Sequence, residues 1–286
     1  MTPIQTARLL GAALLALALS ACSTSLTAMH SARVLDAGQT QFTGALAVPI
    51  ATSAIEGAID LGDAAVDEAQ AAAAADTPLA EDDQRDLTTA ALALALFQPA
   101  LVPELVARVG VGYDLDLGLR LSGQLVKADA QWQLWAGEDR SAASLTLGLA
   151  HHFGPGASAL EPLFKVLEFV KLDDFSRLDL DLALMTSAEF DDWLIFYGGA
   201  RYLASFITLD ANIPDIETAA DVEIIKIDNT IHHVGLTGGL MLGYKFIFLN
   251  LELTAVQALF KPDVLGEPRD LDGLILVPSL GLTLRL

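Results

Sequence analysis

Apolar and polar residues alternate one by one over much of the second half of the chain. Between Arg108 and Ser122 every odd position, from Val109 to Leu121, is apolar, and the even positions are Gly, Asp, Arg or Ser. The same alternation recurs at 127–134, 144–153, 178–184 and 279–286. A period of two is that of a β-strand, whose successive side chains point to opposite faces of a sheet. The pattern therefore predicts strands with one apolar and one polar face.

These segments fit a barrel of about ten strands, with eight or twelve as alternatives. The predicted strands are 39–48, 103–113, 115–123, 125–136, 142–153, 176–186, 192–205, 232–246, 248–258 and 275–286. The connections after the second, fourth, sixth and eighth strands are short, and most of the others are long. Outer-membrane barrels have short turns in the periplasm and long loops outside. We therefore expect both ends of the chain on the short-turn side.

The two faces differ in a way that favours a membrane environment. The apolar face is nearly pure Leu, Val and aromatic, whereas the polar face is rich in Gly and carries charges. About ten residues are what a tilted strand needs to cross a bilayer, and closure leaves no unpaired edge in lipid. The expected fold is all-β, an antiparallel up-and-down transmembrane β-barrel. Its lumen can be filled and salt-bridged rather than open, with these inward candidates: Arg120, Lys127, Asp129, Asp179, Asp181, Glu252 and Arg285.

The amino-terminal residues predict export. Arg8 precedes an apolar run from Leu9 to Leu19, which is too short to span a bilayer and has the order of a secretory signal. The sequence Leu19-Ser20-Ala21-Cys22 resembles the lipobox of bacterial lipoproteins, which implies that Cys22 becomes the mature amino terminus and carries acyl chains. Ser23, where inner-membrane lipoproteins have Asp, implies the outer membrane. The expected organisation is a lipoprotein signal peptide at 1–21, a lipidated linker at 22–38 and a barrel domain at 39–286 with an insertion at 49–102.

The last strand adds a second resemblance. It is similar to the carboxy-terminal signal of bacterial outer-membrane barrels, although those usually end in Phe or Trp and this chain ends in Leu286. The two resemblances together imply a lipid-anchored outer-membrane β-barrel protein. The partners they imply are outer-membrane lipid, the barrel-assembly machinery and the lipoprotein-sorting machinery.

Composition narrows the choice of class. The 286 residues are 53% hydrophobic with a mean hydropathy of +0.47, yet the net charge is -21. No run of 18 apolar residues follows the signal, which disfavours membrane-spanning helices, and the acidic balance disfavours nucleic-acid binding. Cys22 is the only cysteine, so no internal disulfide can form. If the lumen is open, the acidic excess predicts a preference for cations.

The insertion at 49–102 is rich in alanine and acid. The run Ala71–Ala75 precedes the cluster Glu81-Asp82-Asp83 and an apolar stretch from Ala90 to Phe97. Alanine is the best helix former, so one or two helices are expected. They form either a cap over the barrel mouth or part of a partly disordered acidic loop, and composition favours the loop.

Candidate chemistry is sparse. The pairs His151-His152 and His232-His233 fall at the long-loop end, and the alternation turns His152 and His233 inward. Imidazoles at a rim can bind a metal or, beside a carboxylate, activate water. The omptins, which are ten-stranded outer-membrane proteases, are similar in strand count, but this chain matches no motif of theirs. No cofactor motif is present.

We expect a structural or narrow-pore protein without catalytic activity. The alternatives are a rim hydrolase and a soluble periplasmic lipoprotein with a lipocalin-like or sandwich domain that is hydrophobic inside.

Overall fold

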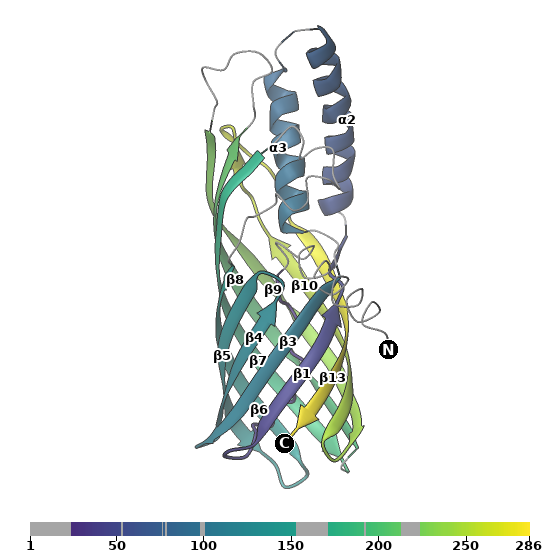
Figure 1. Ribbon diagram of the computed structural model, residues 1–286, viewed down its shortest axis with the longest axis vertical. Coiled ribbons are helices and arrows are strands. Elements are labelled where there is room, and N and C mark those ends of the chain that lie inside the picture. Colours follow the sequence, from purple (N-terminus) through teal and green to yellow (C-terminus); the bar gives the residue numbers. More distant parts are fainter. Residues whose placement is uncertain are drawn as a thin grey trace, which may run out of the picture.

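The computed structural model describes residues 24–52, 54–75, 77, 79–97, 101–152, 171–191, 193–212 and 224–286. The predicted signal peptide and Cys22 lie outside these residues. Ten antiparallel strands pair with their neighbours in chain order, and the first pairs with the last (Figure 1). The prediction of a closed ten-stranded up-and-down barrel is confirmed. The strands are β1 (Thr40–Ala47), β3 (Val102–Gly112), β4 (Leu115–Ser122), β5 (Leu125–Ala136), β6 (Ser141–His152), β7 (Lys171–Phe190), β8 (Leu194–Asn212), β9 (Ile224–Tyr244), β10 (Ile247–Leu259) and β13 (Gly273–Arg285).

Three short strands complete the sheets. β2 (Ile50–Ala51) continues β1 and pairs with β13, while β11 (Asp263–Val264) and β12 (Glu267–Pro268) form a separate hairpin between β10 and β13. None of the three was predicted, because two residues are too few to show an alternation.

The two ends of the barrel differ in their connections. Tight turns join β3 to β4, β5 to β6, β7 to β8 and β9 to β10 at one end, which we call the turn end. Tyr113 and Asp114 connect β3 to β4 with φ of 57° and 56°, the left-handed pair that a two-residue hairpin needs. The opposite end, which we call the loop end, carries the insertion after β1 and the other long connections. The carboxy terminus lies at the turn end, where Leu286 and Thr40 exchange backbone hydrogen bonds of 2.8 and 2.9 Å.

The leucine rows face outward. Along β4, Leu117, Leu119 and Leu121 are 45%, 49% and 47% exposed, while the intervening Gly118 and Arg120 are buried. The same order holds along β6, β10 and β13. The exterior is therefore apolar and the interior polar. A soluble lipocalin-like barrel, with a hydrophobic interior, has the reverse arrangement.

The wall is taller on one side than predicted. β7, β8 and β9 have 20, 19 and 21 residues, against 8 for β1 and β4, and they rise beyond their neighbours at the loop end (Figure 1). The predicted boundaries, 176–186, 192–205 and 232–246, were too short or began too late. Near the loop end the interior becomes apolar, with Leu203, Ile207 and Leu209 buried inside β8. The alternation that marks the lower strands therefore stops, although strand pairing continues.

The insertion forms a helical cap. α2 (Ala54–Ala75) and α3 (Glu81–Leu96) pack side by side above the loop end (Figure 1). In α3, Leu87, Ala90 and Ala93 are fully buried. The interpretation of this segment as a partly disordered acidic loop is wrong for its described part, because α3 offers an apolar face that the barrel mouth covers. No helix in the described part of the chain is long and apolar enough to cross a membrane.

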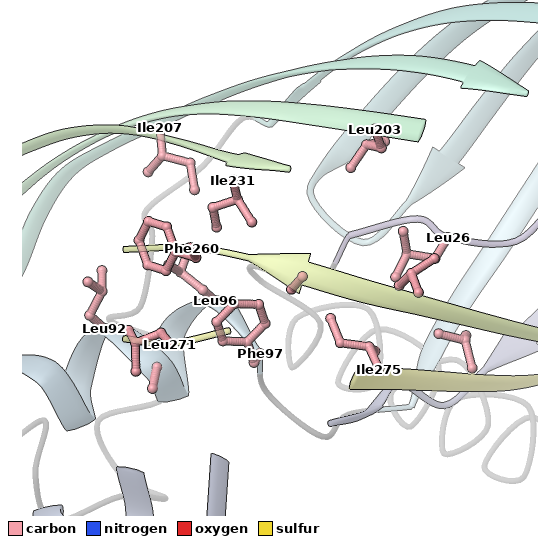
Figure 2. Packing of buried hydrophobic residues seen from close by; sticks show 14 of the residues in the cluster. Leu26, Leu92, Leu96, Phe97, Leu203, Ile207, Ile231, Phe260, Leu271 and Ile275 are labelled. Carbon is pink, nitrogen blue, oxygen red and sulfur yellow. The ribbon is translucent and has the colours of Figure 1, made fainter. Parts of the chain in front are cut away.

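An apolar core closes the loop end of the lumen. Leu92, Leu96 and Phe97 from the cap pack with residues from β8, β9, β10 and β13, and Phe97 meets Phe260 edge to face at 6.4 Å (Figure 2). Leu26, from the segment before β1, belongs to the same cluster. The cap, the strands and the amino-terminal segment thus share one core.

Candidate functional site

The lumen below this core holds a network of buried ion pairs. Asp181 on β7 accepts hydrogen bonds from Lys127 on β5 and from Arg201 on β8, the latter at 2.9 Å from Nη2 to Oδ2. These side chains are at least 94% buried, so each charge depends on its partners rather than on water. The network ties three strands together across the interior.

Two further clusters occupy the ends of the lumen. Towards the turn end, Arg108 on β3 binds Asp116 on β4 and Asp129 on β5, with 2.6 Å from Nη1 to Asp129 Oδ1. Towards the loop end, Arg177 Nε donates to Asp179 Oδ1 on the same strand at 2.7 Å, and His152 Nε2 lies 3.4 Å from Asp179 Oδ2.

Six of the seven predicted lumen residues lie in this interior. Arg120, Lys127, Asp129, Asp179, Asp181 and Glu252 are all buried. Arg285 lies instead at the turn end, half-buried, with its guanidinium 5.2 Å from the Phe248 ring and Nε 3.1 Å from Gln41 Oε1. Sequence reasoning missed five charged lumen residues: Glu104, Arg108, Asp116, Arg177 and Arg201. The first four occupy positions that the alternation assigns to the polar face, so the same pattern could have identified them. Arg201 stands in a segment that is apolar on both faces, where the pattern gives no assignment.

The lumen is nearly neutral. Among the described residues its buried charges are five cations, Arg108, Arg120, Lys127, Arg177 and Arg201, and six anions, Glu104, Asp116, Asp129, Asp179, Asp181 and Glu252. The acidic excess of the chain therefore lies elsewhere, much of it in the cap. The expected cation preference of an open lumen was based on the acidic excess of the whole chain, and among the described lumen residues that excess is a single charge.

The residues before β1 fill this lumen. Eight consecutive residues from Ser25 to Ala32 are each at most 7% exposed, and Leu35 is 8% exposed. Ala28 and Ala32 pack against Met185, Met241 and Phe248 on the apolar part of the wall. The segment thus packs on apolar side chains as well as on charged ones, and both kinds occur on β7, β8 and β10. This also explains why β8 is apolar on both faces near its start, since Ile195 and Tyr197 belong to the same cluster.

The side chain of Glu252, on β10, binds backbone amides of the segment. Its carboxylate accepts the amides of Ala28 and Met29 at 2.7 and 2.6 Å, and the Tyr197 hydroxyl at 2.8 Å. Met29 has a φ of 57°, the left-handed conformation in which successive amides converge on one anion. Charged groups make hydrogen bonds of about 1.5–3 kcal/mol, stronger than those between neutral groups.

Carbonyl groups of the segment are bound by two arginines and a glutamine. Arg120 donates to the Thr27 and Ala28 carbonyls at 2.7 and 2.9 Å, and Arg201 donates to those of Leu26 and Thr27. Gln131 donates to the Ser31 and Ala32 carbonyls at 3.0 and 3.1 Å. Most of the polar contacts in the middle of the segment are therefore made by its main-chain atoms. Side chains of the barrel wall supply the hydrogen-bond donors and acceptors that a neighbouring strand would supply in a sheet.

The predicted rim histidines are interior residues. His152 is 5% exposed and lies edge to face with Phe175 at 6.3 Å, and His233 is 1% exposed. No group of three or more His, Cys, Asp or Glu suited to a metal occurs among the described residues. A base that activates water needs an open cleft, and at 5% and 1% exposure neither His152 nor His233 lies in one among the described residues.

The outer surface of the turn end carries a ring of aromatic side chains, each at least half exposed. They come from β5 and from the turns or adjacent strand ends of three hairpins: Tyr113, Trp132, Trp135, Phe190, Trp193, Tyr244 and Phe246. Aromatic girdles of this kind flank the apolar band of membrane barrels. Fold and site together define the class: a closed ten-stranded β-barrel with an apolar exterior and a charged lumen that its own chain fills.

Comparison with known proteins gives weak matches to solved structures. Neisserial surface protein A is 8% identical with a TM-score of 0.32, covering 86% of this chain and 95% of that one. Ail of Yersinia pestis is 7% identical with a TM-score of 0.29, covering 88% and 100%. A major outer membrane protein from Thermus thermophilus is 10% identical with a TM-score of 0.35, covering 86% and 99%. No family model and no curated protein sequence matches. Likenesses this weak add nothing to what the strand pairing of this chain establishes.

Proposed function

We propose that this chain is a lipid-anchored β-barrel of the bacterial outer membrane, with a structural rather than catalytic role and a lumen closed by its own amino-terminal segment. The observation that carries the membrane assignment is the outward leucine surface, as along β4 and β13, together with the aromatic ring at the turn end. In water, so large an exposed apolar surface would drive aggregation. In a bilayer it contacts acyl chains, and barrel closure satisfies every backbone edge.

The closed lumen supports a structural role over a pore. Charged side chains span the interior in pairs, and the segment from Ser25 to Ala32 occupies the space between them. The apolar core of the mouth adds a second closure at the loop end. The exported chain then depends on the barrel-assembly machinery for insertion and on the lipoprotein-sorting machinery for delivery of the acylated Cys22.

Fractionation after removal of the anchor tests the membrane assignment. The Cys22→Ser protein, exported with an ordinary signal peptide, is expected to stay in the membrane fraction and to migrate faster on gels when unheated than when boiled. A soluble periplasmic lipoprotein would become soluble on the same substitution. Incorporation of labelled palmitate into the wild-type chain, and not into Cys22→Ser, tests the lipid anchor separately.

A further inference from the structure

The amino-terminal segment runs through the lumen in one direction. Thr24 contacts Arg177 at the loop end, and Thr27 contacts Glu104 and Arg120, close to the β4–β5 turn. Farther along, the Val34 amide donates to Gln133 at 3.2 Å and the Leu35 amide donates to Asp116 at 3.4 Å, both near the turn end.

Contacts along a single strand fix the polarity. On β4, which rises from the turn end to the loop end, Arg120 binds Thr27 and Ala28, whereas Asp116 binds Leu35. Four strand residues at about 3.3 Å each separate these sites by about 13 Å. The segment therefore descends as its numbering rises. It leaves the lumen at the turn end, where the Gly38 amide donates to the Gly110 carbonyl at 2.8 Å, and turns into β1.

Gly110 has a defined role at this exit. A Cβ on residue 110 would collide with the carbonyl oxygens of Leu35 and Asp36. The absence of a side chain lets the segment cross the inner face of β3 in direct contact with it. The expectation that both chain ends lie at the turn end holds for Leu286, whereas Thr24, the first described residue, lies at the loop end.

We propose that the mature amino terminus emerges at the loop end of the barrel, so that the acyl chains on Cys22 meet the outer leaflet of the outer membrane. Two residues span at most about 7 Å, whereas the twelve tilted residues of β5 span about 30 Å of barrel height. Cys22 thus cannot reach the turn end while Thr24 contacts Arg177. This inference rests on the proposed lipidation and on the usual orientation of such barrels, with short turns in the periplasm.

Epitope accessibility on intact cells tests the placement. One epitope is inserted between Ser23 and Thr24, a second at Gly266 in the exposed β11–β12 turn of the loop end, and a third between Glu138 and Asp139 in the β5–β6 turn. Antibody should bind the first two on intact cells, and the third only after permeabilisation. The proposal is overturned if the Ser23–Thr24 epitope behaves like the one at 138–139. Reversed accessibility of the two reference sites would refute the assumed orientation, and with it the outer leaflet.

A second measurement tests the threading without any membrane. In a Cys22→Ser background folded in detergent, Ala32→Cys places a thiol at a fully buried lumen position, and Ala37→Cys places one at an exposed position outside the lumen. Maleimide should modify position 37 at least a hundredfold faster than position 32 until the barrel is unfolded. Equal labelling rates at the two positions would show that the segment does not run through the lumen. They would overturn the inference even if the protein proves to be an outer-membrane barrel. If antibody reaches no epitope on intact cells while position 32 is protected, the proposed outer-membrane location is contradicted. The path of the segment through the lumen is then still supported.

Discussion

Ala28 donates its backbone N–H to the carboxylate of Glu252, 224 residues later in the chain, at 2.7 Å. The contact joins the start of the described chain to a strand made near the end of synthesis. The Met29 amide binds the same carboxylate, so Glu252 fixes two successive amides of the segment. The Tyr197 hydroxyl also donates to this carboxylate.

Replacing Glu252 by Gln should loosen the segment. The amide keeps one acceptor but removes the charge and turns an NH₂ group towards donors, which costs about 1.5–3 kcal/mol. Since about 1.4 kcal/mol is a factor of ten, maleimide labelling of Ala32→Cys should become about tenfold to a hundredfold faster. Ser279→Ala is the matched control, because Ser279 faces Glu252 across the β10–β13 pairing and bonds only to the Val277 carbonyl. Equal protection of position 32 in both variants would contradict the assigned role.

Deleting residues 24–35 together with the cap, residues 54–97, should open a path for ions, because both closures of the lumen are then removed. The deletion vacates the lumen but leaves its wall intact, so stepwise currents are expected in planar bilayers, whereas the full-length barrel should be silent. With five cations and six anions facing the lumen, the currents should show little ion preference. Deletion of the cap alone, residues 54–97, is the control and should remain closed, because the segment still fills the lumen. Equal currents from the full-length protein would show that the segment does not seal the barrel.

Asp181 should matter more to stability than Lys127 does. Asp181→Ala leaves two buried cations, Lys127 and Arg201, without their shared partner, and breaking such buried pairs costs about 3–5 kcal/mol. Lys127→Met removes one charge but leaves the pair of Asp181 with Arg201. The temperature or urea concentration at which gel mobility shifts should therefore fall further for Asp181→Ala. The reverse order would mean that the lumen is more hydrated than its burial indicates.

A charge on the outer face should interfere with membrane insertion. Leu119 lies in the middle of β4 and is 49% exposed, so Leu119→Arg places a guanidinium in the apolar band at a cost of about 2–4 kcal/mol. Ala74→Arg, on an exposed position of α2, is the control and should change stability little. Folding into lipid vesicles, followed by gel mobility and urea titration, measures both. A Leu119→Arg barrel as stable as the control would contradict the membrane-facing assignment.

The lower strands were predictable because a membrane barrel imposes one rule on every residue. β5 was placed at its observed bounds, and β4 and β6 within one residue, since apolar residues face outward and polar or small ones inward along most of their length. The rule fails on β8 and β9 near the loop end, where Leu203, Ile207 and Ile231 face the apolar core of the mouth. There the inner face is as apolar as the outer one, and no alternation marks the strand.

The threaded segment could not be predicted in the same way. Residues 24–35 form no helix or strand, and their contacts with Arg120, Gln131 and Glu252 involve main-chain atoms, which leave no trace in the sequence. A pattern of side chains can indicate that a wall is polar, but not that a distant piece of backbone satisfies it.

The seam between β1 and β13 has a consequence for how the molecule is made. A continuous ring of hydrogen-bonded strands admits nothing sideways, so the segment enters the lumen either before β13 meets β1 or lengthwise through an open end. In either order, the start of the described chain is held in place by a strand made much later. A polypeptide that stops before β13 would leave β1 and β10 without their shared partner, and the barrel with two unpaired edges.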